Sequence, residues 1–476
     1  MIGWLIRWTD ERLGSSPLLK KSLRYVFPDH WSFLLGEIAL YSFIVLVVTG
    51  TYLALFFNPS SAESVYHGPY PLLQGVPVSA AFQSTMNISF QVPAGLLIRQ
   101  THHWAALLFV AAIVGHLMRI FFTGAFRKPR DLNYFIGLTL LTLAILEGFM
   151  GYSLPGDLLS GMGLAIAYGV TLSIPILGAS LAFLLWGGEF PGSSSFEPRL
   201  FFLHVFVLPA VIATLIGLHL AIIMRQKHSQ FGGRGHRERN VIGTPLWPAY
   251  ALRATGLMVA VAAVLVLLGG LIQINPIWQY GPYEPWLGTN GAQPDWYLGW
   301  LIGALRLMPG FDIHFLNHTW VPNPFWGGVV FPGVVFTTLY AWPWAERKIA
   351  GDRRRHDLLD RPRDKPWRTA LGAAFFSWVF IIFVAGAADR ILVSVGFGYE
   401  GQVWFFRVAA FVVPFIVFLL TRRVCEELQV TETHPLRSFA GSAVRRSEAG
   451  GFEEIMPIEP GDEHWSGARS DQAVSD

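Results

Sequence analysis

The chain has 476 residues, of which 53% are hydrophobic and only 14% are charged, whereas about 25% of the residues of an average soluble domain are charged. This composition excludes an ordinary soluble globule. The net charge of +3 gives no electrostatic case for nucleic acid as a partner. The single cysteine, Cys425, excludes an intramolecular disulfide and a Cys-rich metal site, so any metal must be bound by histidine.

Eight apolar runs along the chain are long enough to cross a bilayer as helices. They lie near residues 34–57, 102–122, 134–152, 204–224, 255–274, 325–344, 370–391 and 403–421. A ninth apolar stretch, 162–186, is interrupted by Pro175 and several glycines. The sequence therefore predicts an all-α integral membrane protein with eight transmembrane helices and with surface helices between the third and fourth spans.

Basic residues gather in alternate connections between these runs. They crowd the N-terminal segment (20–24) and the loops after the second, fourth and sixth runs (127–130, 225–253 and 347–368). Cytoplasmic loops carry an excess of Lys and Arg, so we expect these segments, and both termini, on the cytoplasmic side. A ninth span would move the two most basic loops outside, which favours surface helices at 162–186.

Two of the expected spans contain a pair of histidines each, His102 with His116 and His204 with His219. Histidine inside a membrane is costly and usually functional. Intervals of fourteen and fifteen residues leave the rings of each pair within ~40° and ~60° of one another and ~21–22 Å apart along the helix. Two such helices side by side predict two bis-histidine sites at different depths, which suits two non-covalent haems. For a single pair, an interhelical hydrogen bond is the plain alternative.

Glycines repeat at the same interval in the first and third spans: Gly36 and Gly50, and Gly137 and Gly151. A flat macrocycle pressed against a helix needs positions without a side chain, although glycine also allows simple close packing of membrane helices. Arg99 and Arg119 lie one helical turn from His102 and His116. Both are candidates for binding haem propionates, and for Arg119 the alternative is a side chain that extends to the membrane interface.

Four motifs occur in a fixed order along the chain. They are Arg-Gln-Thr-His-His-Trp at 99–104, Arg-Lys-Pro-Arg at 127–130, Gly-Tyr-Ser-Leu-Pro at 151–155 and Pro-Asp-Trp-Tyr at 294–297. With them, the chain resembles cytochrome b of the cytochrome bc complexes from about residue 29 to 421. The resemblance implies an outer haem b between His102 and His204 and an inner haem b between His116 and His219. His103 is expected to point elsewhere.

We expect four parts along the chain. A cytoplasmic surface segment covers 1–33, and a four-helix di-haem domain covers 34–254. A four-span domain with the quinol-oxidation loop covers 255–425, and a polar cytoplasmic tail covers 426–476. The tail is assigned no chemistry.

The resemblance assigns quinone chemistry to two loops. At the outer site Asp295, where the family usually has glutamate, would accept a proton from quinol, and Tyr297 would orient the carboxylate or the quinol. From the residues alone, a helix N-cap before the run 296–307 is the favoured interpretation of Asp295, and an interfacial tyrosine is that of Tyr297. Lys227, His228 and Arg253 lie in the loop of the inner quinone site, where topogenic positive charge also explains them.

Three departures from the family pattern stand out. The fifteen-residue interval between His204 and His219 is like that of the chloroplast-type relatives, whereas eight spans in one chain are like the mitochondrial and many bacterial ones. Leu34 stands where the chloroplast type has the cysteine of an extra haem, so no third, covalent haem is expected. Gly156 and Asp157 replace the usual Trp after the proline, and Ala254 stands where many relatives have aspartate. The pattern suggests the actinobacterial branch.

The resemblance implies a quinol–cytochrome c reductase of a bacterial cytoplasmic membrane, with menaquinone or ubiquinone as the substrate. One electron of the quinol would pass to a Rieske iron–sulfur protein and the other through both haems to a second quinone. A c-type cytochrome subunit, a homodimer of the complex and an attached terminal oxidase are the further expected partners. Two alternatives are a di-haem membrane anchor of a dehydrogenase, which would not need the 294–297 motif, and a transporter whose histidines relay protons. The transporter should show inverted repeats, which the sequence lacks.

Overall fold

The computed structural model describes residues 2–14, 23–288, 291–433, 443–446 and 452–455. Within these residues, seven helical segments are long and apolar enough to cross a membrane. They run over Trp31–Ala54, Gly95–Phe122, Asp131–Tyr152, Phe196–Gln226, Leu246–Leu271, Pro366–Arg390 and Tyr399–Val430. The chain is therefore a multi-pass membrane protein, as its composition predicts.

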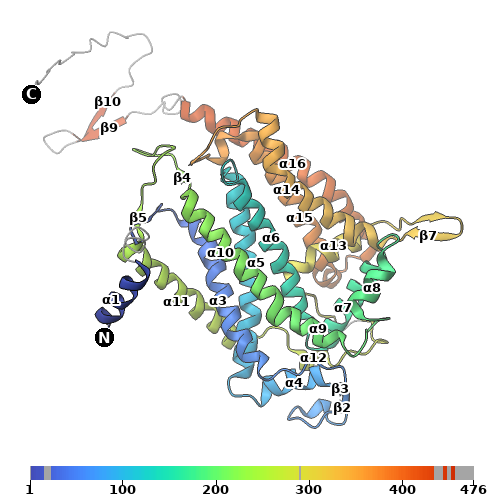
Figure 1. Ribbon diagram of the computed structural model, residues 1–476. Helices are drawn as coiled ribbons and strands as arrows, with labels where there is room; N and C mark the ends of the chain where they lie inside the picture. Colours follow the sequence, from blue (N-terminus) through green and yellow to red (C-terminus); the bar gives the residue numbers. More distant parts are fainter. Residues whose placement is uncertain (1, 15–22, 289–290, 434–442, 447–451, 456–476) are drawn as a thin grey trace, which may run out of the picture.

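These segments are built on long helices (Figure 1). The helices are α3 (Leu34–Ala54), α5 (Gly95–Phe122), α6 (Asp131–Tyr152), α10 (Leu208–Gln226), α11 (Ala251–Leu271), α15 (Pro366–Leu392) and α16 (Tyr399–Thr433). Short segments precede three of them: η1 (Trp31–Phe33), α9 (Phe196–Phe202) with the π turn η3 (Leu203–Val207), and the π turn η4 (Leu246–Tyr250). The helix α16 continues to Thr433, so the first residues of the expected tail 426–476 are helical. Apart from the antiparallel pair β9 (Ala443–Arg446) and β10 (Phe452–Ile455), the rest of the tail lies outside the described residues.

The expected span at 325–344 forms a helix that is less apolar than the others. The π turn η6 (Trp326–Val330) leads into α14 (Phe331–Ala350). With 20 residues α14 is about as long as a bilayer core requires. It contains Pro343 and ends with Arg347 and Lys348. It is not among the seven apolar segments of the described residues.

The stretch 162–186 forms two short helices, α7 (Leu158–Leu172) and α8 (Gly178–Trp186). The carboxylate of Asp157 caps α7 by accepting a hydrogen bond from the Leu159 N–H at 3.0 Å. At 15 and 9 residues, neither helix has the ~20 residues of a span. This agrees with the expectation that the stretch does not cross the membrane.

The remaining elements are short. The helices are α1 (Ile2–Leu13), η2 (Pro71–Leu73), α4 (Ala80–Phe90), α12 (Ile277–Tyr280), η5 (Trp296–Leu298), α13 (Gly299–Leu307), η7 (Pro362–Asp364) and η8 (Val393–Val395). Three antiparallel pairs join β1 (Val26–Phe27) to β5 (Thr244–Pro245), β2 (Glu63–Val65) to β3 (Pro77–Ser79), and β6 (Ile313–Phe315) to β7 (His318–Val321). A parallel pair joins β4 (Gln230–Phe231) to β8 (Leu358–Leu359). The pairs β1–β5 and β4–β8 tie together segments that lie far apart in the sequence.

The helices α3, α5, α6 and α10 lie side by side, with α3 against α5, α5 against α6 and α6 against α10 (Figure 1). Val110 of α5, Leu138 of α6 and Ile212 of α10 belong to one buried core. The helix α11 packs on α3 and α5, whereas α13, α15 and α16 pack on one another. On the outside of α16, Phe411 is 80% exposed. An aromatic side chain with this much exposed surface suits contact with lipid.

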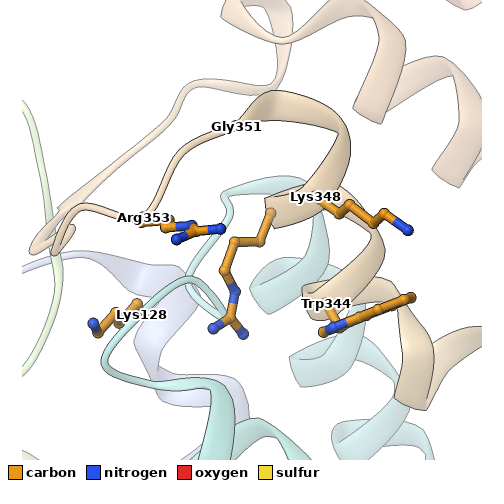
Figure 2. Close-up of a pocket in the computed structure, with 6 residues that line it drawn as sticks. Lys128, Trp344, Lys348, Gly351 and Arg353 are labelled. Atoms are coloured by element: carbon orange, nitrogen blue, oxygen red, sulfur yellow. The ribbon is translucent and has the colours of Figure 1, made fainter.

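One end of the helices carries the basic loops, and we call it the basic end. Arg130, at the start of α6, pairs with Asp357 of the loop after α14 at 2.8 Å. A cavity of about 480 Å³ lies at this end. Figure 2 shows its lining residues Lys128, Lys348 and Arg353 beside Trp344. The loops 127–130 and 347–368 thus share one face, as their charge predicts.

Candidate functional site

His102 of α5 and His204 of η3 face each other across the bundle, with ring centroids 6.4 Å apart and ring planes at 80°. A metal–nitrogen bond is about 2 Å long, and the centre of an imidazole lies about 1 Å beyond its nitrogen. Two imidazoles on opposite sides of one ion are therefore expected ~6 Å apart. The observed separation is one at which both imidazoles could bind the same metal ion.

The π turn at His204 explains the fifteen-residue interval in this span. A π turn is a helical segment with i→i+5 hydrogen bonds, in which one residue is inserted. Because η3 contains His204, it takes up the residue by which the interval to His219 exceeds that between His102 and His116. With this inserted residue, the angle between His204 and His219 around their helix is close to the angle between His102 and His116. The angles predicted for ideal α-helices, ~40° and ~60°, did not allow for it.

The four glycines of the repeat lie opposite the four histidines. A Cβ atom at Gly151 would lie 2.5 Å from Cε1 of His204, and one at Gly50 would lie 3.0 Å from Cε1 of His102. The corresponding distances are 3.2 Å from Gly36 to His116 and 3.7 Å from Gly137 to His219. At three of the four positions a side chain would displace the ring, so the glycines give room to the imidazoles.

The first pair, His102 and His204, has partners for its second ring nitrogens. Nδ1 of His102 lies 2.9 Å from the Thr49 hydroxyl, and Nδ1 of His204 lies 3.2 Å from the Glu147 backbone carbonyl and 2.9 Å from the Glu147 carboxylate. Metal-binding histidines usually have their other nitrogen tied in this way, which fixes the tautomer and the ring orientation.

The second pair, His116 and His219, lines a cavity of about 470 Å³ together with Gly36, Gly137 and Arg119. Within the described residues, buried atoms without a hydrogen-bond partner include Nδ1 of both histidines and Nε and Nη2 of Arg119. A guanidinium with free donors beside two imidazoles suits a group that carries acidic substituents. No three or more metal-binding side chains converge in the described part of the chain. Two-histidine sites therefore fit an ion whose other ligands come from a macrocycle.

Arg99 lies beside the first pair but is engaged by the backbone. Its two terminal nitrogens donate to the Asn275 carbonyl at 3.1 and 3.2 Å, and its guanidinium lies 5.7 Å from the centre of the Trp278 ring. Its Nε is buried without a partner among the described residues. One donor of Arg99 is thus available to an anionic group.

Asp295 lies at the end of the bundle opposite the basic end and joins two elements. Its Oδ1 accepts a hydrogen bond from Nε2 of His103 at 2.6 Å, and its Oδ2 accepts one from the Tyr297 hydroxyl at 2.9 Å. Asp295 occupies the N-cap position of η5, but its carboxylate makes no capping hydrogen bond there. Tyr297 is 2% exposed, and its hydroxyl lies next to Gly148 of α6. His103 therefore belongs to this cluster, which its position beside His102 alone did not reveal.

Of the three residues expected at the inner quinone site, two line the cavity beside His116 and His219. Lys227 and His228 line it, whereas Arg253 does not; its side chain is 67% exposed and pairs with Asp29 at 3.1 Å. Burial, with Arg119 and Arg130 nearby, lowers the pKa of His228 to about 4. His228 is therefore uncharged at neutral pH.

Sequence reasoning missed two carboxylates besides His103. Glu147 approaches His204, and Glu37 lines the cavity with Tyr41 and Tyr250. Each glutamate is a single acidic residue in an otherwise apolar run. That is the signal that marks a functional candidate in a membrane.

The comparisons with known proteins agree with this geometry. The family model described as cytochrome b(N-terminal)/b6/petB matches residues 107–282. The chain is similar to proteins named cytochrome bc1 complex cytochrome b subunit. The one from Mycobacterium bovis is 46% identical over 96% of this chain and 83% of the relative. The one from Streptomyces coelicolor is 45% identical over 94% and 82%, and the one from Corynebacterium efficiens is 42% identical over 96% and 84%.

The fold is also similar to a solved chain of a hyperthermophilic respiratory complex III, with a TM-score of 0.63 and 20% identity. The match covers 87% of this chain and 99% of that one. Because curated relatives are similar over nearly the whole chain, the chain belongs to the family of cytochrome b subunits of the cytochrome bc1 complex.

Proposed function

We propose that the protein oxidises quinol at Asp295 as a subunit of a quinol–cytochrome c reductase and carries electrons between two b haems. The observation that carries the proposal is the separation of 6.4 Å between the rings of His102 and His204. Membership of the cytochrome b family implies haem b as the cofactor. His102 with His204, and His116 with His219, would hold one haem each.

At the Asp295 site the chain supplies a proton acceptor. A quinol that loses two electrons releases two protons, so a base is needed beside a hydroxyl. Asp295 would accept one proton, while Tyr297 and His103, which both hydrogen-bond to it, hold its two oxygens in place. Whether the quinol is menaquinol or ubiquinol, both carry the hydroxyl that this chemistry needs.

The chemistry that bound haem b supplies is one-electron transfer between the two ends of the bundle. The rings of His102 and His204 are held in position by Thr49 and Glu147. Arg99 and Arg119 would bind the haem propionates. One electron of the quinol leaves to a Rieske iron–sulfur partner, and the other crosses to a second quinone. Lys227 and His228 line the cavity where that quinone would bind. Arg253 lies outside this cavity, at the surface of the protein.

We propose eight spans, with α14 as the sixth, and the basic end on the cytoplasmic side with both termini. Eight spans divide the chain into the surface segment 1–33, the di-haem domain 34–254, the quinol-loop domain 255–425 and the cytoplasmic tail. The positive-inside rule supports this orientation. A Rieske protein, a c-type cytochrome subunit and a second copy of the complex are the proposed partners, and a terminal oxidase is a further candidate.

A stoichiometric assay of the purified complex tests the proposal. Quinol is added to the complex with an oxidised c-type cytochrome, and the reduction of the b haems and of cytochrome c is followed by absorbance. We expect the b haems and the cytochrome to be reduced together in the first turnover. Reduction of cytochrome c with no electron reaching the b haems would contradict the proposal that the two electrons of the quinol take different paths.

Replacing Glu147 by Gln tests its contact with His204. A charged hydrogen-bond partner makes a ligating imidazole a stronger donor and stabilises the oxidised iron. Since charge-assisted hydrogen bonds exceed neutral ones by about 1 kcal/mol, E147Q should raise the midpoint potential of one haem by roughly 50 mV. A redox titration checks this. The other haem serves as the internal control, and an unchanged potential would refute the assignment.

A further inference from the structure

The cavity beside His116 and His219 contains a single carboxylate. Among the described residues that line it, Glu37 is the one acidic side chain, whereas Arg119, Arg130 and Lys227 supply positive charge. Glu37 lies in the first turn of α3, next to Gly36, the glycine that abuts the His116 ring. A carboxylate within an apolar membrane helix is costly and is usually retained for function.

Two phenols hold the Glu37 carboxylate. The Tyr41 hydroxyl, one turn further along α3, donates to Oε2 at 3.1 Å. The Tyr250 hydroxyl, from the start of α11, donates to Oε1. The Tyr250 ring stacks on Phe27 at 3.9 Å, and Phe27 also lines the cavity. The carboxylate is therefore oriented from two helices beside an aromatic wall that suits a planar quinone ring.

The same cluster leads towards solvent. Beyond Tyr250 lies Asp29, whose side chain is 55% exposed and close enough to act electrostatically on the Tyr250 hydroxyl. The Thr244 hydroxyl donates to Asp29 at 2.8 Å, and the β1–β5 pairing holds Thr244 opposite Phe27. Asp29, Tyr250 and Glu37 thus form a series of protonatable groups from the surface to the cavity.

Reduction of a quinone to a quinol takes two electrons and two protons, and each carbonyl oxygen gains an O–H bond. On the basis of the proposed function, the two electrons come from two quinols oxidised in turn at Asp295, each of which supplies one. We propose that Glu37 is the residue that donates protons to the quinone at the basic end. In this step the O–H bond of the Glu37 carboxylic acid breaks and its proton passes to a carbonyl oxygen of the reduced quinone. Solvent then reprotonates the carboxylate along Asp29 and Tyr250, and a second cycle supplies the second proton.

The groups that surround Glu37 come from several elements. They are Tyr41 on α3, His116 and Arg119 on α5, Arg130 before α6, His219 on α10, Lys227 and His228 after α10, Tyr250 in η4, and Asp29 and Arg253 at the surface. Most of these are cations, phenols or imidazoles, and Ala254 adds no acid. The alternative role for Glu37 is purely structural, as a hydrogen-bonded link between α3 and α11.

A single-turnover experiment on the purified whole complex separates these roles. The b haems are reduced through the Asp295 site by two equivalents of quinol, with an oxidised c-type cytochrome present to take the other two electrons, and their reoxidation by added quinone is followed at pH 6 and pH 8. In E37Q we expect normal haem content and normal haem reduction. Reoxidation should slow at least about tenfold at pH 8 and less at pH 6, where bulk protons replace the lost donor.

Three further variants test the proposed role of Glu37. E37D keeps a protonatable group and should restore most of the rate at pH 8. E63Q removes an exposed carboxylate in β2 and should behave as the wild type. Y250F, which removes the Tyr250 hydrogen bond alone, should slow reoxidation several-fold at pH 8, and it provides the test if E37Q does not assemble.

Two results would overturn the inference. One is reoxidation at the wild-type rate at both pH values in E37Q, or in Y250F where E37Q cannot be purified. The other is an equal slowing in E37Q and E37D with no dependence on pH, which a structural link predicts. Failure of the underlying function is a separate result, because wild-type b haems would then not be reduced by quinol.

Discussion

Replacing Asp295 by Asn is expected to lower kcat for quinol oxidation by about 10²-fold or more while the haem content stays unchanged. The amide keeps the size of the side chain and its hydrogen bond from Tyr297, but it cannot accept a proton. General base catalysis by a positioned side chain contributes typically ~10²–10⁴-fold. Asp295 accepts hydrogen bonds from both His103 and Tyr297, so the substitution changes the group at the centre of this cluster. Steady-state reduction of a c-type cytochrome by quinol measures the effect.

Two variants serve as controls for D295N. Asp295→Glu keeps a carboxylate at this position and should retain substantial activity. Asp312→Asn changes an exposed carboxylate that accepts a hydrogen bond from the Asn323 N–H, and it should leave kcat unchanged. Wild-type turnover in D295N would remove Asp295 from the reaction.

Substitution of the histidines should remove the haems in pairs. Leu in place of His102 or His204 leaves one imidazole at the first site, and a single axial ligand should hold its haem too weakly for it to survive purification. The second haem should remain. Leu in place of His116 or His219 should have the opposite effect. Haem is quantified per chain, and the two sites are told apart by a redox titration.

The control for this series is His318→Ala, because His318 is an exposed residue of the hairpin β6–β7. It should retain both haems. A variant in which His102→Leu removes the haem of His116 rather than that of His204 would show that the sites are paired differently. Loss of both haems in every variant, with the chain still inserted in the membrane, would show that they do not bind independently.

The sequence predicts the parts of the site that repeat along a helix. Histidines and glycines at intervals of fourteen or fifteen residues define helix faces, and the structure places each glycine against one histidine ring. Periodicity of this kind depends on the geometry of one helix. The non-spanning nature of 162–186 also follows from local features, Pro175 and the charge of the flanking loops.

The contacts between distant segments were not predictable in the same way. His103 and Asp295 are 192 residues apart, and no local pattern indicates which nearby polar group a loop carboxylate will contact. Without the resemblance, the sequence therefore favoured an N-cap at Asp295. Glu37 lies in the first turn of α3, where the helix dipole favours an acidic residue whatever its contacts. Only the packing of α3 against α11 brings Tyr250 to it.

The most direct test of the central claim is haem quantification in the purified wild-type complex. A reduced-minus-oxidised spectrum combined with a pyridine-haem assay gives the number of b haems for each copy of this chain. We predict two, with distinct midpoint potentials, because His102 with His204 and His116 with His219 form separate sites at different depths. A preparation from haem-sufficient cells that contains no b haem, or one b haem per chain, would contradict the account.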